Sequence, residues 1–177
     1  MIPILWVFLL AAPPGPPLTV SLTEAGPARV GVEVPWFAGW TPDEQILNRT
    51  KVLQGQPPGT KAIVVVVFAT WCAPCAAGLE VLVQARPALD AAGVRLLLVA
   101  FREEADTVRP WLAARGVDAK TPLILDRFGR AAAAFGAEQG GRATLPRTVV
   151  LAPDGTVRAL LGAEGPDYLE RILALAR

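Results

Sequence analysis

Two cysteines, Cys72 and Cys75, are the residues of this chain whose type and spacing could do chemistry directly. They are the only cysteines among 177 residues, and Ala73-Pro74 separates them. Two thiols at this spacing suit reversible dithiol–disulfide chemistry. A free cysteine has a pKa of about 8.5, and a neighbouring helix N-terminus can lower it to about 7 or below, because that end carries partial positive charge and unpaired N–H groups.

The segments on either side of the pair predict a strand and a helix that position it. Residues Ile63–Ala69 form a continuous run of mostly β-branched residues, which is typical of a central strand covered on both faces. From Cys75 to about Asp90 the pattern predicts a helix, which Pro87 ends or kinks. The two thiols are therefore expected at a strand-to-helix junction.

Strand and helix signals alternate through the rest of the chain. The segment Thr41-Pro42-Asp43-Glu44 predicts the start of a short helix to about Arg49, and Val30–Val34 predicts an edge strand. The later predicted elements are a strand at Val94–Phe101, a helix at Asp106–Arg115, a strand at Pro122–Leu125, a helix at Arg127–Phe135, a hairpin of Arg147–Leu151 and Val157–Leu161 around Pro153-Asp154-Gly155, and a helix from Pro166 to about Ala176. This order predicts an α/β fold with a mixed central sheet, a C-terminal antiparallel hairpin and helices on both faces.

Composition excludes several classes of function. Histidine is absent, so neither a Ser-His-Asp triad nor a Cys-His nucleophile pair can exist. A structural zinc site normally has four Cys or His ligands and this chain supplies two, so we predict no metal and no other cofactor; a zinc site shared between two subunits is a disfavoured alternative. The net charge of +1, from 17 basic and 16 acidic residues, gives no electrostatic case for nucleic acid or an anionic membrane surface.

The N-terminus has the pattern of an export signal. Ile2–Ala12 is an apolar run of signal-peptide length, too short for a membrane-spanning helix, and a Pro-rich breaker follows it. It lacks a basic residue before the apolar run and a clean small-x-small cleavage site, so a buried N-terminal segment or a misplaced start codon is the alternative. We predict a signal peptide and breaker at residues 1–17, an irregular lead-in at 18–35, one domain at 36–177, and a periplasmic or other extracytoplasmic location.

Three segments carry a resemblance to a known family. They are Phe68-Ala69-Thr70-Trp71-Cys72-Ala73-Pro74-Cys75, Leu145-Pro146, and Val149-Val150-Leu151-Ala152-Pro153-Asp154-Gly155. With them the chain resembles the thioredoxin superfamily from roughly Val30 to Arg177, and within it the exported TlpA-like branch, which includes reductases serving cytochrome c maturation. The resemblance implies a thioredoxin-like fold.

The resemblance also implies a role for each matched residue. Cys72 would be the attacking nucleophile and Cys75 the more buried resolving thiol, which together form a redox disulfide. Trp71 would flank the site and Pro74 would influence its redox poise. Pro146 matches the family's cis-proline, which lies against the disulfide. The backbone of Leu145 would pair with the partner's chain as an added strand.

The chain departs from the family pattern at three positions. Val66 stands where thioredoxins carry a buried Asp, and Gly78 stands where TlpA-like reductases often carry a Glu. Glu80 lies too far around the predicted helix to replace it. The proton acceptor for Cys75 is therefore open: water, a carboxylate from another segment, or none, with slow catalysis. The third departure is Arg147, just after Pro146. It is either a solvated residue at a strand start or a substrate-facing cation near the active surface, which favours the thiolate or contacts a partner.

We therefore expect a thiol–disulfide oxidoreductase that serves as a reductant of exported proteins. Its expected partners are protein thiols or disulfides and an unknown electron-donor protein. A non-enzymatic thioredoxin-like binding module with a structural disulfide is one alternative. A peroxiredoxin-like redoxin is another, although Val67 stands where the Thr of the peroxiredoxin motif should be.

Overall fold

The computed structural model describes residues 27–162 and 165–177. The strands are β1 (Ala38–Trp40), β2 (Ile46–Asn48), β3 (Ala62–Phe68), β4 (Val94–Phe101), β5 (Leu123–Asp126), β6 (Glu138–Gln139), β7 (Arg142–Ala143), β8 (Arg147–Leu151) and β9 (Val157–Leu161). The helices are α1 (Arg49–Gln54), α2 (Ala73–Gln84), α3 (Arg86–Ala91), α4 (Ala105–Ala113), α5 (Arg130–Ala134) and α6 (Tyr168–Ala174). The predicted signal peptide at 1–17 and the first half of the lead-in, residues 18–26, lie outside the described residues.

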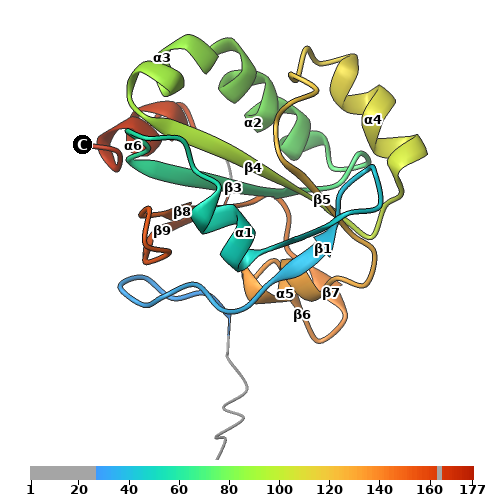
Figure 1. The fold of residues 1–177 in the computed structure, drawn as a ribbon. Coiled ribbons are helices and arrows are strands. Elements are labelled where there is room, and N and C mark those ends of the chain that lie inside the picture. Colours follow the sequence, from blue (N-terminus) through green and yellow to red (C-terminus); the bar gives the residue numbers. More distant parts are fainter. Residues whose placement is uncertain (1–26, 163–164) are drawn as a thin grey trace, which may run out of the picture.

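A seven-stranded mixed sheet runs through the molecule in the order β2-β1-β5-β4-β3-β8-β9, and β6 and β7 form a separate hairpin (Figure 1). β3 pairs in parallel with β4 over its whole length, and β8 runs antiparallel on its other side. Every residue of β3 is buried, as expected for a run of β-branched residues covered on both faces. The predicted mixed sheet, terminal hairpin and covering helices are present.

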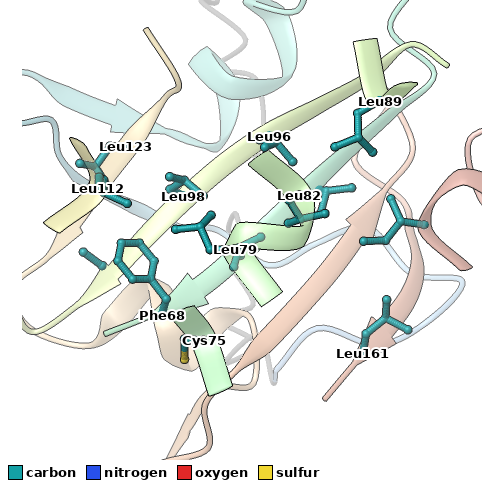
Figure 2. Packing of buried hydrophobic residues seen from close by; sticks show 14 of the residues in the cluster. Phe68, Cys75, Leu79, Leu82, Leu89, Leu96, Leu98, Leu112, Leu123 and Leu161 are labelled. Atoms are coloured by element: carbon teal, nitrogen blue, oxygen red, sulfur yellow. The ribbon is translucent and has the colours of Figure 1, made fainter. Parts of the chain in front are cut away.

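Two hydrophobic clusters lie on opposite faces of the sheet. One holds residues of α2, α3, α4 and α6, and the other holds residues of α1 and α5 (Figure 1). Cys75 belongs to the first cluster, together with Phe68 and Leu79 (Figure 2). A leucine buried in this way contributes about 1.5–3 kcal/mol relative to an exposed one. Both cysteines are thus part of the buried core on this face of the sheet.

The helix that follows Cys72 begins earlier than predicted. α2 starts at Ala73, with Cys72 as the residue that caps it, and ends at Gln84. Ala85 separates it from α3, which carries Pro87 in its first turn. The predicted interruption near Pro87 is therefore present, as two consecutive helices.

The predicted helix at 41–49 is wrong, because residues 41–48 form the turn and second strand of a β-hairpin. β1 and β2 pair antiparallel, and Trp40 pairs with Leu125 to join the hairpin to the main sheet. The Thr41 hydroxyl, expected to cap a helix, accepts the N–H of Gln45 across the turn, and Glu44 takes a left-handed φ of 57°. The helix begins only at Arg49, where the Asn48 side chain accepts the N–H of Lys51.

Three smaller differences are an edge strand that does not form, a helix that starts later, and a hairpin that was not predicted. Val30–Val34 forms a turn with a single bridge, Glu33 to Thr156, in place of an edge strand. α5 starts at Arg130 and not at Arg127, after Gly129 with φ 74°. The β6-β7 hairpin turns through Gly140 and Gly141, both with positive φ. No helix in the described part of the chain is both long and apolar enough to cross a membrane.

Candidate active site

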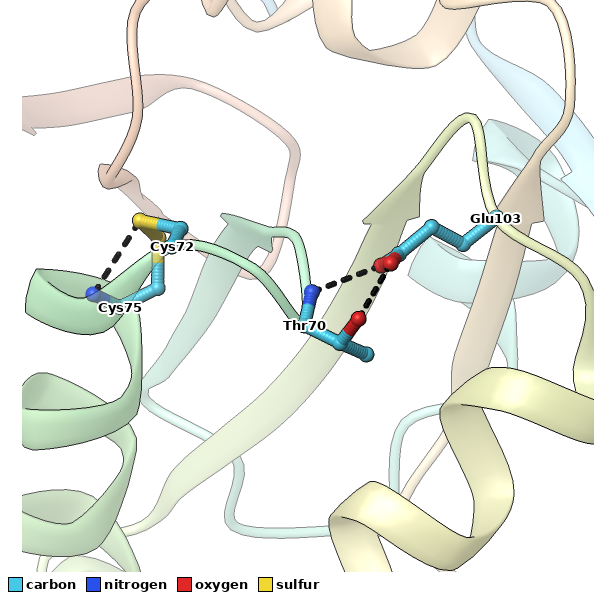
Figure 3. The surroundings of a disulfide bond; sticks show 4 residues. All are labelled: Thr70, Cys72, Cys75 and Glu103. Atoms are coloured by element: carbon cyan, nitrogen blue, oxygen red, sulfur yellow. Dashed lines mark hydrogen bonds between the residues drawn. A yellow bond between two sulfur atoms is a disulfide. The ribbon is translucent and has the colours of Figure 1, made fainter.

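Cys72 and Cys75 form a disulfide at the junction between β3 and α2, with an S–S distance of 1.99 Å (Figure 3). Cys72 is 5% exposed and Cys75 is 1% exposed. Ala73, Pro74 and Trp71 around them are exposed, so the pair lies just beneath the surface. Cys72 is less exposed than expected for an attacking residue, although it remains the more accessible of the two.

The Cys72 sulfur occupies the capping position of α2. Its Sγ accepts the N–H of Cys75 at 3.3 Å, as a capping hydroxyl or carboxylate does in other helices. Pro74, in the first turn, has no N–H of its own to offer. When the pair is reduced, a thiolate at this sulfur meets the partial positive charge and free N–H groups of the helix start, which stabilise it over the thiol.

The predicted flanking residues lie near the same end of the sheet. The Leu145–Pro146 peptide bond is cis, and Pro146 is buried. Because Arg147 pairs with Val67 across the antiparallel strands, Pro146 stands level with Phe68, four residues before Cys72. Leu145 is partly buried and packs against the cluster that contains both cysteines. Trp71 is 66% exposed and is available for contact with another molecule.

Arg147 points away from this group. Its Nε donates to the carbonyl oxygen of Phe135 at 3.2 Å, just after α5. Its register partner Val67 belongs to the cluster on the α5 face of the sheet. Burial lowers the pKa of the Arg147 guanidinium from its usual value. The structure therefore does not place Arg147 beside the disulfide. Its side chain is half-buried, so Arg147 is not a solvated residue at the strand start either.

The two positions at which the family would carry a carboxylate are filled differently here. Val66 is buried and pairs with Thr148, whose hydroxyl lies 2.8 Å from the hydroxyl of Tyr168. Gly78 is buried in α2, while Glu80 is exposed and lies 3.9 Å from Arg115. Neither position therefore carries a carboxylate, and a buried pair of hydroxyl groups lies beside Val66.

A carboxylate from another segment lies close to the site. Glu103, between β4 and α4, accepts the N–H of Thr70 at 2.8 Å and the hydroxyl of Thr70 at 2.5 Å (Figure 3). The sequence allowed a carboxylate from another segment as the proton acceptor for Cys75, but it did not identify Glu103. The available signal was topological, because loops that follow adjacent parallel strands meet at the same edge of a sheet. Among residues 27–162 and 165–177, no group of three or more His, Cys, Asp or Glu side chains could hold a metal ion.

Solved structures with a similar fold include several named for thiol chemistry. A thiol:disulfide interchange protein from Chlorobium tepidum TLS is 26% identical, with 84% of this chain and 97% of that chain covered and a TM-score of 0.63. A second, putative thiol:disulfide interchange protein DsbE from Chlorobium tepidum is 19% identical, with 85% and 99% covered and a TM-score of 0.66. The peroxidoxin BcpB from Mycobacterium tuberculosis is 18% identical, with 84% and 96% covered and a TM-score of 0.67. The chain therefore has the thioredoxin-like fold that its motifs predict.

The sequence gives a family match over most of its length. A search of the curated proteins found no significant match. Residues 30–160, which include the β3-α2 junction and the Leu145–Pro146 bond, match the AhpC/TSA family. The chain belongs to the AhpC/TSA family.

Proposed function

We propose that the protein is a thiol–disulfide oxidoreductase that uses Cys72 and Cys75 to reduce disulfides of exported proteins. The observation that carries this proposal is the Cys72–Cys75 disulfide, whose first sulfur caps α2 and accepts an N–H there. Such a position favours the thiolate, which is the attacking species in disulfide exchange. The 26% identity to a thiol:disulfide interchange protein supports the same chemistry.

The proposed reaction is two successive exchanges. The Cys72 thiolate attacks one sulfur of the substrate disulfide, which forms a mixed disulfide and releases the first substrate thiolate. Cys75 then loses its proton and attacks the Cys72 sulfur, which closes the Cys72–Cys75 bond and releases the second substrate thiolate. Two electrons pass from the protein to the substrate, and an electron-donor protein must return them by the reverse exchange.

Substrate recognition is proposed to involve the surface around Trp71. An exposed indole supplies a large apolar contact at little cost in side-chain entropy. The Leu145 backbone, before the cis bond, would hydrogen-bond with an extended segment of the partner as an added strand. The N-terminal apolar run and the resemblance to the TlpA-like branch support export, and the same resemblance supports the reducing direction.

The test is turbidity-monitored reduction of insulin by dithiothreitol, with wild type compared with Cys72→Ala. We expect the wild type to accelerate reduction and the variant to match the uncatalysed rate. Equal rates for the two proteins would support a structural disulfide in a binding module and contradict the enzyme proposal.

Peroxide reduction is a second candidate because the family match and a peroxidoxin neighbour favour it. The peroxiredoxin motif places a Thr three residues before the attacking Cys, which corresponds to position 69 and not to Val67 when Cys72 attacks. Ala69 stands there, and the missing Thr argues against peroxide reduction. Consumption of hydrogen peroxide by the reduced protein, followed beside the insulin assay, separates the two activities.

A further inference from the structure

The side chain of Glu103 contacts the loop that leads into Cys72. Each carboxylate oxygen accepts one hydrogen bond from Thr70: Oε2 from the backbone N–H and Oε1 from the hydroxyl (Figure 3). The contact joins residues 33 positions apart and is partly buried. Hydrogen bonds to a charged acceptor are stronger than those between neutral groups, so this pair can hold a loop in place.

The backbone before Glu103 adopts an uncommon conformation. Arg102 N–H donates to the Asp126 carbonyl at 3.0 Å, which completes the last pair of β4 with β5, Phe101 with Asp126. Arg102 then takes φ 55°, in the left-handed region that residues other than glycine seldom adopt. Such conformations persist where the surroundings favour them, and they cluster at functional sites. Here the turn occurs one residue before the carboxylate that reaches Thr70.

The contact reaches Cys72 through a single tight turn. The Cys72 N–H donates to the Ala69 carbonyl at 3.1 Å, so residues 69–72 form a hydrogen-bonded β-turn. Thr70 and Trp71 are its two central residues. Hydrogen bonds that hold the N–H and hydroxyl of Thr70 therefore also hold this β-turn in place. The β-turn positions the Cys72 sulfur beside the N–H of Cys75.

The neighbouring carboxylate is engaged elsewhere. Glu104 is exposed, and its Oε2 lies 2.9 Å from Nε of Arg127. Glu103 and Glu104 thus have the same charge and adjacent positions but different contacts. This pair provides a matched control for any effect of charge or of local helix stability at the start of α4.

We infer that Glu103 is a positioning residue for the redox pair: through its two hydrogen bonds to Thr70 it fixes the turn that holds the Cys72 sulfur at the start of α2. This inference rests on the proposed function. Glu103 acts through Thr70, and the property it sets is the reactivity of the Cys72 thiolate.

The experiment compares Glu103→Ala, Glu103→Gln, Thr70→Val and Glu104→Gln in the full chain. Two quantities are measured: the rate of insulin reduction, and the pH midpoint of Cys72 alkylation by iodoacetamide, read by mass spectrometry on the reduced protein. The glutamine amide can accept the Thr70 N–H and donate to the hydroxyl oxygen, so Glu103→Gln keeps the contact and removes only the charge.

For Glu103→Ala we expect insulin reduction to slow by about tenfold, since both hydrogen bonds to a charged group are lost. The alkylation midpoint is expected to rise, because the sulfur loses its fixed place beside the helix N–H groups. Thr70→Val should change both quantities in the same direction and by less. Glu104→Gln should resemble the wild type, and Glu103→Gln, whose two hydrogen bonds are neutral and weaker, should lie between the wild type and Glu103→Ala.

Several results would overturn the inference. Unchanged rate and midpoint in Glu103→Ala would do so, as would a shift of equal size in Glu104→Gln. A fall of the midpoint in both Glu103 variants would show that charge acts and not position. If Glu103→Ala does not fold, Thr70→Val decides, and an unchanged midpoint there contradicts the inference. If the wild type does not reduce insulin, the proposed function fails, while the alkylation midpoint still tests Glu103.

Discussion

The sulfur of Cys72 serves as a helix cap, and the neighbouring residue decides how many donors it meets. A capping side chain accepts from the N–H of the second or third helical residue. In α2 the second residue is Pro74, so the third residue, Cys75, supplies the donor, at 3.3 Å. The Pro between the cysteines therefore limits how far the helix start stabilises the Cys72 thiolate.

Replacing this proline gives the first residue-scale prediction. Pro74→Ala adds an N–H in the first turn of α2, so the Cys72 thiolate gains a potential donor and the reduced form is stabilised. We expect the pH midpoint of Cys72 alkylation to fall and the reduction potential to become less negative, by about 30 mV if the gain is near 1.4 kcal/mol. Equilibration with glutathione buffers measures the potential.

Pro87→Ala is the matched control, because Pro87 lies in the first turn of α3 without a thiol at the helix cap. This variant should leave the potential of the disulfide unchanged. A more negative potential in Pro74→Ala, or an equal change in both variants, would contradict the capping explanation.

At the residue scale, the sequence was sufficient to predict the positions of residues that lie close together along the chain. Cys72, Pro74 and Cys75 follow one another at a predictable strand-to-helix junction, and Pro146 belongs to a short recognisable segment. Glu103 could not be identified in this way, because its contact with Thr70 depends on β3 and β4 being neighbours and on the left-handed turn at Arg102. Arg147 was ambiguous because the face to which a strand-start residue points depends on register.

At the scale of elements, α5 depends on a buried carboxylate. Asp126 is 3% exposed and accepts the N–H groups of Ala131 at 3.1 Å and Ala132 at 2.7 Å, where a capping side chain would otherwise be needed. Burial raises the pKa of Asp126 above its usual value, and the hydrogen bonds from Ala132 and Ala131 offset part of this increase. Asp126 therefore links α5 to β5 in a pH-dependent way.

The second prediction concerns this linkage. Because the folded pKa of Asp126 is raised, the folded state binds its proton more tightly than the unfolded state. Its contribution to stability is full below the unfolded pKa, near 3.8, and is lost as the pH rises through the folded pKa. We expect the free energy of unfolding of the wild type, minus that of Asp126→Asn, to fall across this interval.

Urea denaturation at a series of pH values from below 3.8 upward gives this difference directly. Asn cannot titrate, so any pH-independent cost of the substitution adds a constant to this difference. The change of the difference with pH therefore reports the titration of Asp126. A difference that rises with pH, or stays flat, would contradict a raised pKa at Asp126.

Element boundaries were predictable where one signal dominated. The bounds of β4, β8 and β9 agree with the sequence pattern, since each is a short apolar run with turn residues beside it. Residues 41–49 were predicted wrongly because the same Thr-Pro-Asp-Glu segment suits both a helix start and a turn. Pairing of Trp40 with Leu125 in the main sheet favours the turn, and such a long-range contact cannot be recognised in the sequence of residues 41–49.

At the scale of the whole molecule, the sheet brings three loops to one end. The cysteine pair follows β3, Glu103 follows the parallel neighbour β4, and the cis bond precedes β8, which pairs antiparallel with β3 (Figure 1). The order of the predicted strands and helices was enough to anticipate a mixed sheet with a terminal hairpin. It was not enough to show which loops touch, because contacts depend on side-chain direction and local turns.

The division of labour between the two cysteines is the central claim, and trapping of mixed disulfides tests it most directly. Reduced Cys75→Ala and Cys72→Ala are each mixed with a disulfide-bonded protein substrate, and covalent adducts are measured by mass spectrometry after acid quenching. We predict that Cys75→Ala accumulates an adduct through Cys72, because the resolving thiol is gone, and that Cys72→Ala forms little or none. Equal adducts in both variants, or an adduct in Cys72→Ala alone, would contradict the account.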